Sequence, residues 1–362
     1  TVNGNLRLNE VTLSLQEMTL AMNGPITVHN GAVSSSGLRV ATGDTRMTLT
    51  GDLFIQDTPR FRGSVAVSGL KLGGDSASGL AIPKDLIADA PITLTDCAFY
   101  GVPIERARAT ATLRDGALDL THVEVQALSG SAKGTLSIAA GGKSSCDLAI
   151  SVHNADMRKL IRDTTSSKSW IDGDLDLEGR LFGSTDSLDG SLALTARNGE
   201  IRRYRLISQI FSLLNIYKII HAGDIDSLSS HFTYNRLSST FTIRDGIISF
   251  DDLALDSNSL QLSAVGTYSM KTKNVDAVLG VQPLESVDKT VSMIPLLGWV
   301  LTGDKGKMII VSMTVKGHID DPTVQVAPIT TISTAVTSTL LRTLRIPSHL
   351  IDESLKILKK KE

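Results

Sequence analysis

Seven histidines are the residues best suited to acid–base or metal chemistry, because imidazole can act as a general base or as a metal ligand near neutral pH. They are His29, His122, His153, His221, His231, His318 and His349. None belongs to an H-E-x-x-H motif, and none has a second histidine four residues further on, the spacing that places two ligands on one helix face. We therefore expect isolated histidines and neither a metal site nor a metal cofactor.

No segment has the pattern of a catalytic nucleophile or a phosphate loop. The G-x-S-x-G elbow that exposes a nucleophilic serine is absent. The glycine- and lysine-rich stretch 298–307 has Asp304 where a phosphate loop requires lysine, and Lys307 is followed by Met308. We interpret this stretch as a turn between a helix and a strand, and expect the protein not to be an enzyme and to carry no cofactor.

Two pairs of adjacent acids, Asp251-Asp252 and Asp320-Asp321, are the next candidates for acid–base chemistry. Neighbouring residues on a strand point to opposite faces, so neither pair forms a catalytic dyad. We expect turn or solvent positions for both, especially since Pro322 directly follows the second pair.

The two cysteines, Cys97 and Cys146, lack CxxC spacing and belong to no metal motif. Two buried free thiols are the favoured interpretation, with a disulfide between them as the alternative.

Composition excludes several classes of partner. Hydrophobic residues make up 41% of the 362 residues, and 36 basic residues face 38 acidic ones, which argues against disorder and against a nucleic-acid-binding surface. Aromatic residues are only 4%, too few for stacking platforms for bases or sugars. The sequence contains no run of about 18 apolar residues, the length that a bilayer-spanning helix requires.

Glycine followed by alternating apolar residues is the recurring local pattern, and it is typical of a half-buried strand that leaves a turn. It begins at Gly4, Gly51, Gly63, Gly116, Gly134, Gly173, Gly190, Gly246, Gly266 and Gly306. Chance would give about half as many such sites. Strands of this kind have one apolar and one polar face, and the apolar face must pack against a helix, another sheet or a ligand.

Candidate helices are few and lie mostly late in the chain. The patterns predict helices over 205–220, 284–301, 329–344 and 350–361, and short helical segments over 83–90 and 155–164. The short segments indicate soft boundaries near residues 90 and 165. These helices are too few to cover the apolar face of a sheet this large.

The region 173–328 resembles the C-terminal region of the AsmA-like family, the bridge-like lipid transfer proteins of the Gram-negative envelope that include YhdP and TamB. Three stretches carry the resemblance, in this order: 190–201 leading into the apolar helix with 213–215; 245–250 followed by 264–268; and 294–298 followed by Gly303 and then 315–324. The first 165 residues share only the style of the strands.

The resemblance implies a mainly β fold: a long, curved, open antiparallel sheet, shaped as a repeating taco-like groove, with a few late helices and a helical tail. It divides the chain into a β-groove segment at 1–165, an AsmA-like region at 166–328 and an amphipathic helical tail at 329–362. Phospholipid acyl chains would bind in the groove and move along it between the inner and outer membranes. A structural or adhesive β-solenoid without lipid cargo is the alternative.

Alternation parity assigns residues to the groove lining. They are Leu118, Leu120, Leu136, Leu175, Leu177, Leu192, Leu194, Ile248, Phe250, Leu260, Leu262, Val311, Met313 and Val315. A one-residue slip in any strand would turn its whole set outward.

The tail ends in a cluster of lysines, Lys356, Lys359, Lys360 and Lys361, which suits an anionic membrane surface. Lysines that merely complement a helix dipole are the simpler alternative. The chain begins at Thr1 without a signal sequence, so we interpret it as part of a longer periplasmic protein whose inner-membrane anchor, implied by the family, lies outside this sequence.

Overall fold

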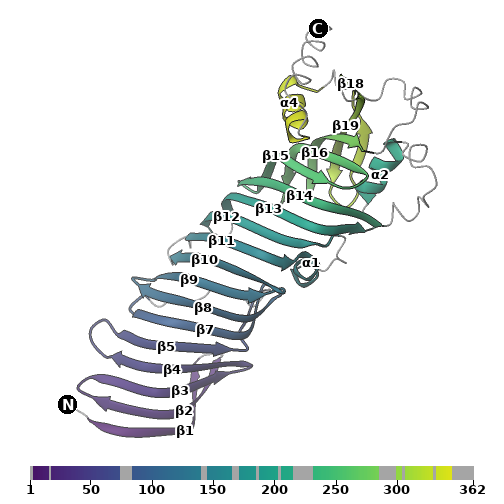
Figure 1. Ribbon diagram of the computed structural model, residues 1–362. Helices are drawn as coiled ribbons and strands as arrows, with labels where there is room; N and C mark the ends of the chain where they lie inside the picture. Colours follow the sequence, from purple (N-terminus) through teal and green to yellow (C-terminus); the bar gives the residue numbers. More distant parts are fainter. Residues whose placement is uncertain are drawn as a thin grey trace. The chain divides into compact units, whose positions relative to one another are not determined.

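The chain is mainly β, with an open, largely antiparallel sheet and few short helices, which confirms the predicted fold class (Figure 1). The computed structural model describes residues 3–15, 18–73, 84–139, 145–164, 171–184, 187–202, 205–214, 231–284, 299–303, 306–328 and 332–344. Two compact units are present. Unit 1 comprises Thr1–Lys168 and Glu178–Leu188, and unit 2 comprises Ser169–Leu177 and Asp189–Glu362.

Unit 1 is built from successive strands joined by short turns. They are β1 (Gly4–Leu15), β2 (Met18–His29), β3 (Ala32–Thr42), β4 (Thr45–Phe54), β5 (Arg60–Ser68), β6 (Lys71–Leu72), β7 (Ile87–Phe99), β8 (Val102–Arg114), β9 (Ala117–Ala127), β10 (Gly130–Ala139) and β11 (Ser145–Asp156). Sequence neighbours pair antiparallel, except that β5 and β6 run parallel to β7. The helix α1 (Met157–Thr164) follows β11, close to the predicted segment 155–164.

The predicted helical segment over 83–90 is wrong for the residues that the structure describes. Lys84 and Asp85 form a turn, and Ile87 begins β7. Ile87 pairs with Arg60 of β5, and Ala88 pairs with both Phe61 and Leu113. Pairing with two neighbouring strands therefore overrides a weak local helical pattern.

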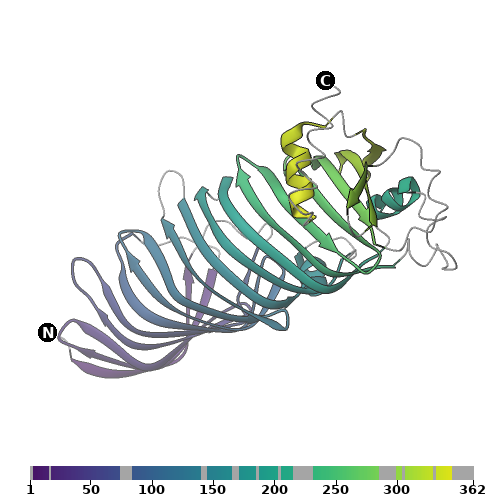
Figure 2. The ribbon, with the colours of Figure 1, turned by 45° about the horizontal axis from the view of Figure 1, so that its top comes forward.

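Bulges interrupt many of the strand pairs in unit 1. Register shifts occur between Leu8 and Val11, between Ser35 and Leu38, and in β8 against β9. Several bulged residues have positive φ without being glycine, among them Glu10 and His122. A bulge bends its strand and increases the local twist, and the strands are visibly bent (Figure 2).

Unit 2 contains the remaining strands and two of the described helices. β12 (Asp174–Ser184) and β13 (Ser187–Arg202) have residues in both units, followed by β14 (His231–Arg244), β15 (Ile247–Asp256), β16 (Leu260–Ser269), β17 (Asn274–Pro283), β18 (Trp299–Gly303), β19 (Gly306–His318) and β20 (Thr323–Val326). Strands β13 to β17, then β19 and β20, pair in this order, all antiparallel, and β18 pairs with β19.

The late helices agree only in part with the predicted ranges. Helix α2 (Arg205–Leu214) covers the first part of 205–220, and α4 (Thr334–Thr343) lies within 329–344. Ser333 caps α4, its side chain accepting a hydrogen bond from the backbone N–H of Val336. The predicted helix 350–361 and the residues after Leu214 in the first range lie outside the described residues.

The predicted helix over 284–301 is wrong at its C-terminal end, because Trp299–Gly303 forms β18. This strand makes a hairpin with β19, in which Trp299 pairs with Ile310 and Gly303 with Gly306. The glycine- and lysine-rich stretch therefore joins two strands, and not a helix to a strand. Residues 285–298 lie outside the described part of the chain.

Candidate functional site

One face of the unit 1 sheet carries a continuous row of apolar side chains, which we call the apolar ladder. It consists of Val11, Met22, Val40, Met47, Val67, Leu94, Ala107, Val125, Ala132 and Val152. Each residue lies directly opposite the next, on ten neighbouring strands from β1 to β11. Directly opposed side chains have Cβ atoms about 4.5–5.5 Å apart, so the ladder forms an unbroken apolar stripe across the strands.

Further apolar rows widen this stripe on the same face. One consists of Leu38, Leu49, Val65, Ile92 and Ala109, and the other of Ala90, Ala111, Leu120, Leu136 and Leu148. Most of these side chains are only half-buried. Helix α1, the one helix in the described part of unit 1, contacts β8 and β11. Within that part, no second layer of strands or helices packs over the apolar face.

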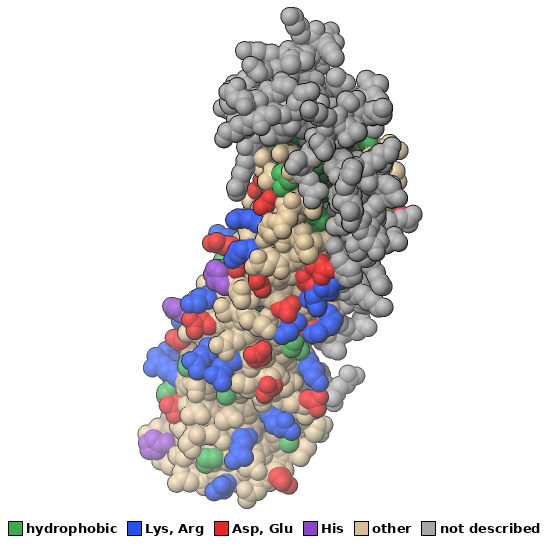
Figure 3. All heavy atoms as spheres, turned by 45° about the vertical axis from the view of Figure 1, so that its right-hand side comes forward, with side chains coloured by type: hydrophobic (Ala, Val, Ile, Leu, Met, Phe, Trp, Pro, Cys, Tyr) green, Lys and Arg blue, Asp and Glu red, His purple; other side chains and the backbone are tan. Residues whose placement is uncertain are grey.

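The opposite face of unit 1 is polar and more exposed. Asn23, Arg39, Thr48, Ala66 and Thr93 form one directly opposed row on it. The Ala66 side chain on this face is exposed, whereas the equally small Ala107 side chain on the ladder is buried. This difference is expected if the strands curve toward the ladder, because side chains on the concave face crowd together. Figure 3 shows one face of the molecule, on which acidic and basic side chains intermingle and hydrophobic ones are isolated.

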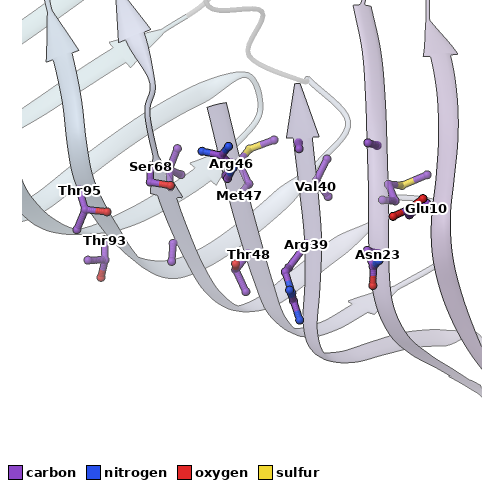
Figure 4. Close-up of a pocket in the computed structure, with 15 residues that line it drawn as sticks. Glu10, Asn23, Arg39, Val40, Arg46, Met47, Thr48, Ser68, Thr93 and Thr95 are labelled. Carbon is purple, nitrogen blue, oxygen red and sulfur yellow. The ribbon is translucent and has the colours of Figure 1, made fainter. Parts of the chain in front are cut away.

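A hollow of about 490 Å³ lies over β1 to β5 and β7 (Figure 4). Most of its lining residues belong to the polar face, among them Arg39, Arg46 and Thr93, and ladder residues such as Met22 and Met47 alternate with them along the same strands. The mixed lining distinguishes this hollow from the cavity of unit 2.

Unit 2 has a cavity of about 470 Å³ with an almost purely hydrocarbon lining, between α2 and one face of the sheet. Its lining residues are Ile171, Leu192, Ile201, Leu206, Ile207, Ile210, Leu237, Phe241, Ile243, Ile248, Phe250, Leu253, Leu255, Leu262, Ala264, Tyr268, Val275, Ala277, Leu279, Val315 and Ile319. No charged side chain is among them. Phe241 and Phe250, directly opposed on β14 and β15, contact edge to face with ring centroids 6.1 Å apart.

Helix α2 covers this cavity and is joined to the edge strand β20 by one side chain. Gln209 donates a hydrogen bond from Nε2 to the carbonyl oxygen of Pro322 over 3.0 Å. Its Oε1 accepts a hydrogen bond from the backbone N–H of Val324 over 3.1 Å. The amide thus makes both bonds that a neighbouring strand residue would make, while Ile207 and Ile210 of the same helix line the cavity.

The other face of the unit 2 sheet is covered by α4, which contacts β15, β16 and β17 (Figures 1 and 2). Gly280 permits the close approach, since a Cβ built there would lie 3.6 Å from Leu340 Cβ. Three buried polar atoms on these elements have no hydrogen-bond partner in the described part of the chain: Ser263 Oγ, Gln282 Oε1 and Thr337 Oγ1. The two faces of this sheet are therefore filled differently, one by a helix and the other by a cavity.

A cluster of interacting ionisable groups in unit 2 joins β13 and β14 to the segment that precedes β12. The Tyr234 hydroxyl donates to the backbone carbonyl of Asp172, and burial, reinforced by Asp172 and Asp174, raises the pKa of Tyr234. Arg202 donates to Glu200 and lies 3.0 Å from a carboxylate oxygen of Asp172. A tyrosine with a raised pKa is a poor acid or base near neutral pH, so this cluster favours a structural role.

Both acid pairs are exposed to solvent, as expected. Asp251 and Asp252 are exposed within a bulge of β15, between Phe250 and Leu253. Asp252 Oδ1 accepts hydrogen bonds from Ser239 Oγ and from the backbone N–H of Thr240. Asp320 and Asp321 lie in the turn before β20.

Neither a metal site nor a membrane-spanning helix was found in the described part of the chain. No group of three or more His, Cys, Asp or Glu side chains there could hold a metal ion. None of the described helices is long and apolar enough to cross a membrane. Cys97 and Cys146 are both free, as expected, but only Cys97 is buried, and Cys146 is half-buried.

No protein-family model, curated protein or solved structure matches this chain.

The predicted lining residues fall into three groups. Leu192, Ile248, Phe250, Leu262 and Val315 line the unit 2 cavity. On the unit 1 apolar face, Leu118, Leu120 and Leu136 are half-buried, Leu120 pairing directly with Leu136 and Leu118 with Ile138.

The third group does not line the cavity. Leu175, Leu260, Val311 and Met313 are buried in unit 2, and Leu177 and Leu194 are half-buried. Lys356, Lys359, Lys360 and Lys361 lie outside the described residues.

Alternation parity missed two kinds of lining residue. Leu253 and Leu255 line the cavity together with Ile248 and Phe250, although their numbers differ in parity, because the bulge at Asp251-Asp252 reverses the alternation. Ile207 and Ile210 reach the cavity from a helix. Their signal was present in the helical spacing of the apolar residues in 205–214, but the helix was not assigned to the lining.

Proposed function

We propose that this protein binds phospholipid acyl chains along the apolar ladder of unit 1 and in the apolar cavity of unit 2, and conducts lipid between the inner and outer membranes. The apolar ladder carries this proposal. Ten neighbouring strands present directly opposed apolar side chains, and in the described part of unit 1 no helix or second sheet packs over them. Such a face requires an apolar partner, and hydrocarbon chains meet that requirement.

The mechanism is passive binding and diffusion. Each methylene group transferred from water to the apolar face contributes about 0.8 kcal/mol, while the charged headgroup stays in water. Neighbouring ladder positions are chemically similar, so a chain moves from one to the next without a large change in free energy. No covalent bond changes and no cofactor takes part, so we propose no enzymatic activity.

The resemblance to the AsmA-like family supports a periplasmic location for this proposal, with the parent protein anchored in the inner membrane. The lysines of the tail, Lys356 and Lys359 to Lys361, are proposed to lie against an anionic membrane surface.

The alternative, a structural or adhesive β-solenoid, requires a closed apolar core. The half-exposed ladder and the antiparallel pairing of unit 1 argue against it.

Site-specific photo-crosslinking in cells tests the proposal. A photoreactive amino acid replaces Leu136 on the apolar face of β10, and in a matched control it replaces the exposed Thr135 on the opposite face of the same strand. Crosslinked phospholipid, identified by mass spectrometry, is expected at Leu136 and not at Thr135. Equal labelling at both positions, or none at Leu136 when native mass spectrometry also finds no bound lipid, would overturn the proposal.

A further inference from the structure

The unit 2 cavity differs from the unit 1 face in having a roof. Leu206, Ile207 and Ile210 of α2 line it from one side, and the sheet lines it from the other. Ile210 is 2% exposed and Ile207 is 9% exposed. A ligand in this cavity is therefore held between two layers, whereas a ligand on the unit 1 ladder contacts one layer within the described part of that unit.

The roof is held at its edge by the two hydrogen bonds of Gln209. They join α2 to Pro322 and Val324, at the start of β20. Val324 belongs to β20, at the edge of the sheet, and Pro322 directly precedes that strand. Backbone groups at a sheet edge otherwise bond to water or to another chain. Opening the roof requires breaking both bonds, so Gln209 acts as a latch on α2.

We propose that this cavity is a holding site for a single acyl chain of a lipid, with α2 as its roof and Gln209 as the positioning residue that slows exchange. The inference rests on the proposed function in taking a lipid as the ligand. It adds that an acyl chain is retained in the unit 2 cavity, whereas an acyl chain on the open ladder of unit 1 exchanges rapidly.

The size and chemistry of the cavity favour one hydrocarbon chain. Its volume of about 470 Å³ is roughly three times that of a 150 Å³ apolar cavity that binds benzene, which corresponds to room for on the order of 18 carbon atoms. The lining has no charged group, so a headgroup gains nothing by entering. A peptide is disfavoured as well, because β14 to β17 pair on both sides and leave few backbone groups free to bond it.

Binding of cis-parinaric acid to the delipidated 362-residue chain tests the site. Ala264, 3% exposed and part of the lining, is replaced by Phe to fill the cavity. Thr267→Phe, at an exposed position on the opposite face of the same strand, is the control. Ala264→Phe is expected to remove one equivalent of bound probe with slow dissociation, and Thr267→Phe to remove none. Unchanged slow-phase stoichiometry in a folded Ala264→Phe protein would overturn the proposal.

The latch is tested separately by stopped-flow dissociation of the same probe. Gln209→Leu keeps the length and apolar stem of the side chain but breaks both bonds, and it is expected to raise the slow dissociation rate about tenfold, which corresponds to 1.4 kcal/mol. An unchanged rate would contradict the latch. Should Ala264→Phe fail to fold, a photoactivatable fatty acid bound to the unmodified chain provides the answer, since crosslinks must map to the cavity-lining segments 237–243 and 253–255.

These experiments separate the two proposals. If no lipid crosslinks at Leu136 but one equivalent of probe still dissociates slowly, lipid binding on the apolar ladder is refuted and the holding site in unit 2 is supported. If lipid crosslinks at Leu136 but Ala264→Phe removes no slowly dissociating probe, the holding site is refuted and lipid binding on the ladder is supported.

Discussion

Gly51 on β4 and Gly63 on β5 lie directly opposite each other, and a Cβ built on Gly63 would lie 2.0 Å from the carbonyl oxygen of Thr50. The same Cβ would lie 2.8 Å from the Cα of Gly51. The two strands approach so closely here that neither position has room for a side chain. The pair thus explains why glycine occurs within these strands as well as at turns.

Gly63→Ala is expected to lower the free energy of unfolding by about 1–3 kcal/mol, because the backbones of β4 and β5 must move apart. The measurement is the urea midpoint of unit 1, followed by circular dichroism. Gly4→Ala is the control, since nothing lies within 4 Å of a Cβ built there, and its effect should stay within about 0.5 kcal/mol. Equal midpoints for the two variants would contradict the close approach.

Ser263 and Ser312 flank Gly280 in one row and should respond oppositely to loss of the hydroxyl group. Ser263 is fully buried, and its Oγ has no partner in the described part of the chain. Ser312 Oγ donates to the carbonyl of Ala327 over 2.5 Å. Ser263→Ala is expected to raise the free energy of unfolding by about 1 kcal/mol and Ser312→Ala to lower it by about 1 kcal/mol. Urea denaturation of both variants measures the two changes in the free energy of unfolding. Changes of the same sign would refute the prediction.

Tyr234 should make unit 2 sensitive to alkaline pH. Its pKa is raised in the folded protein, so its contribution to stability is present below the unfolded pKa of about 10 and is lost as the pH rises further. Tyr234→Phe is expected to cost about 1 kcal/mol at neutral pH through the lost hydrogen bond to Asp172.

The Tyr234→Phe variant should also lose part of the alkaline destabilisation, as measured by urea unfolding at neutral and alkaline pH. Tyr100→Phe, at a side chain that is 71% exposed, should change neither property.

Cys146 should react slowly with iodoacetamide. Burial, with a smaller contribution from the Asp147 carboxylate, raises the pKa of the Cys146 thiol, so little reactive thiolate forms near neutral pH. In a Cys97→Ala background, Asp147→Asn is expected to speed alkylation severalfold, because it removes the negative charge and leaves Arg180 unpaired nearby. Asp44→Asn, in the ion pair with Lys71 elsewhere in unit 1, is the control. A slower reaction in Asp147→Asn would show that the sign is wrong.

The class of fold was predictable because alternation is a local property. In β10, Ala132, Leu136 and Ile138 alternate with polar residues, and this pattern alone indicates one apolar and one polar face. The direct pairing of Leu120 with Leu136 follows the parity assigned from the sequence. The free cysteines and the scarcity of helices were predictable for a similar reason, since each depends on short patterns.

The composition of the cavity was predictable only in part. Ile248 and Phe250 were assigned by parity, but Leu253 and Leu255 follow a bulge whose position no local signal fixed. Within the helical segment predicted over 83–90, the residues from Ile87 onward belong instead to β7, because pairing on both sides outweighs the local preference of a few residues.

The sequence by itself determined that this protein is a sheet with an aliphatic face, because side-chain alternation is encoded residue by residue. Only the tertiary structure decided how the residues of that face are arranged. Strand register aligned ten residues, from Val11 to Val152, into one ladder, and two hydrogen bonds from Gln209 joined α2 to β20 beside an apolar cavity. Both results depend on contacts between residues far apart in the chain, which periodicity does not encode.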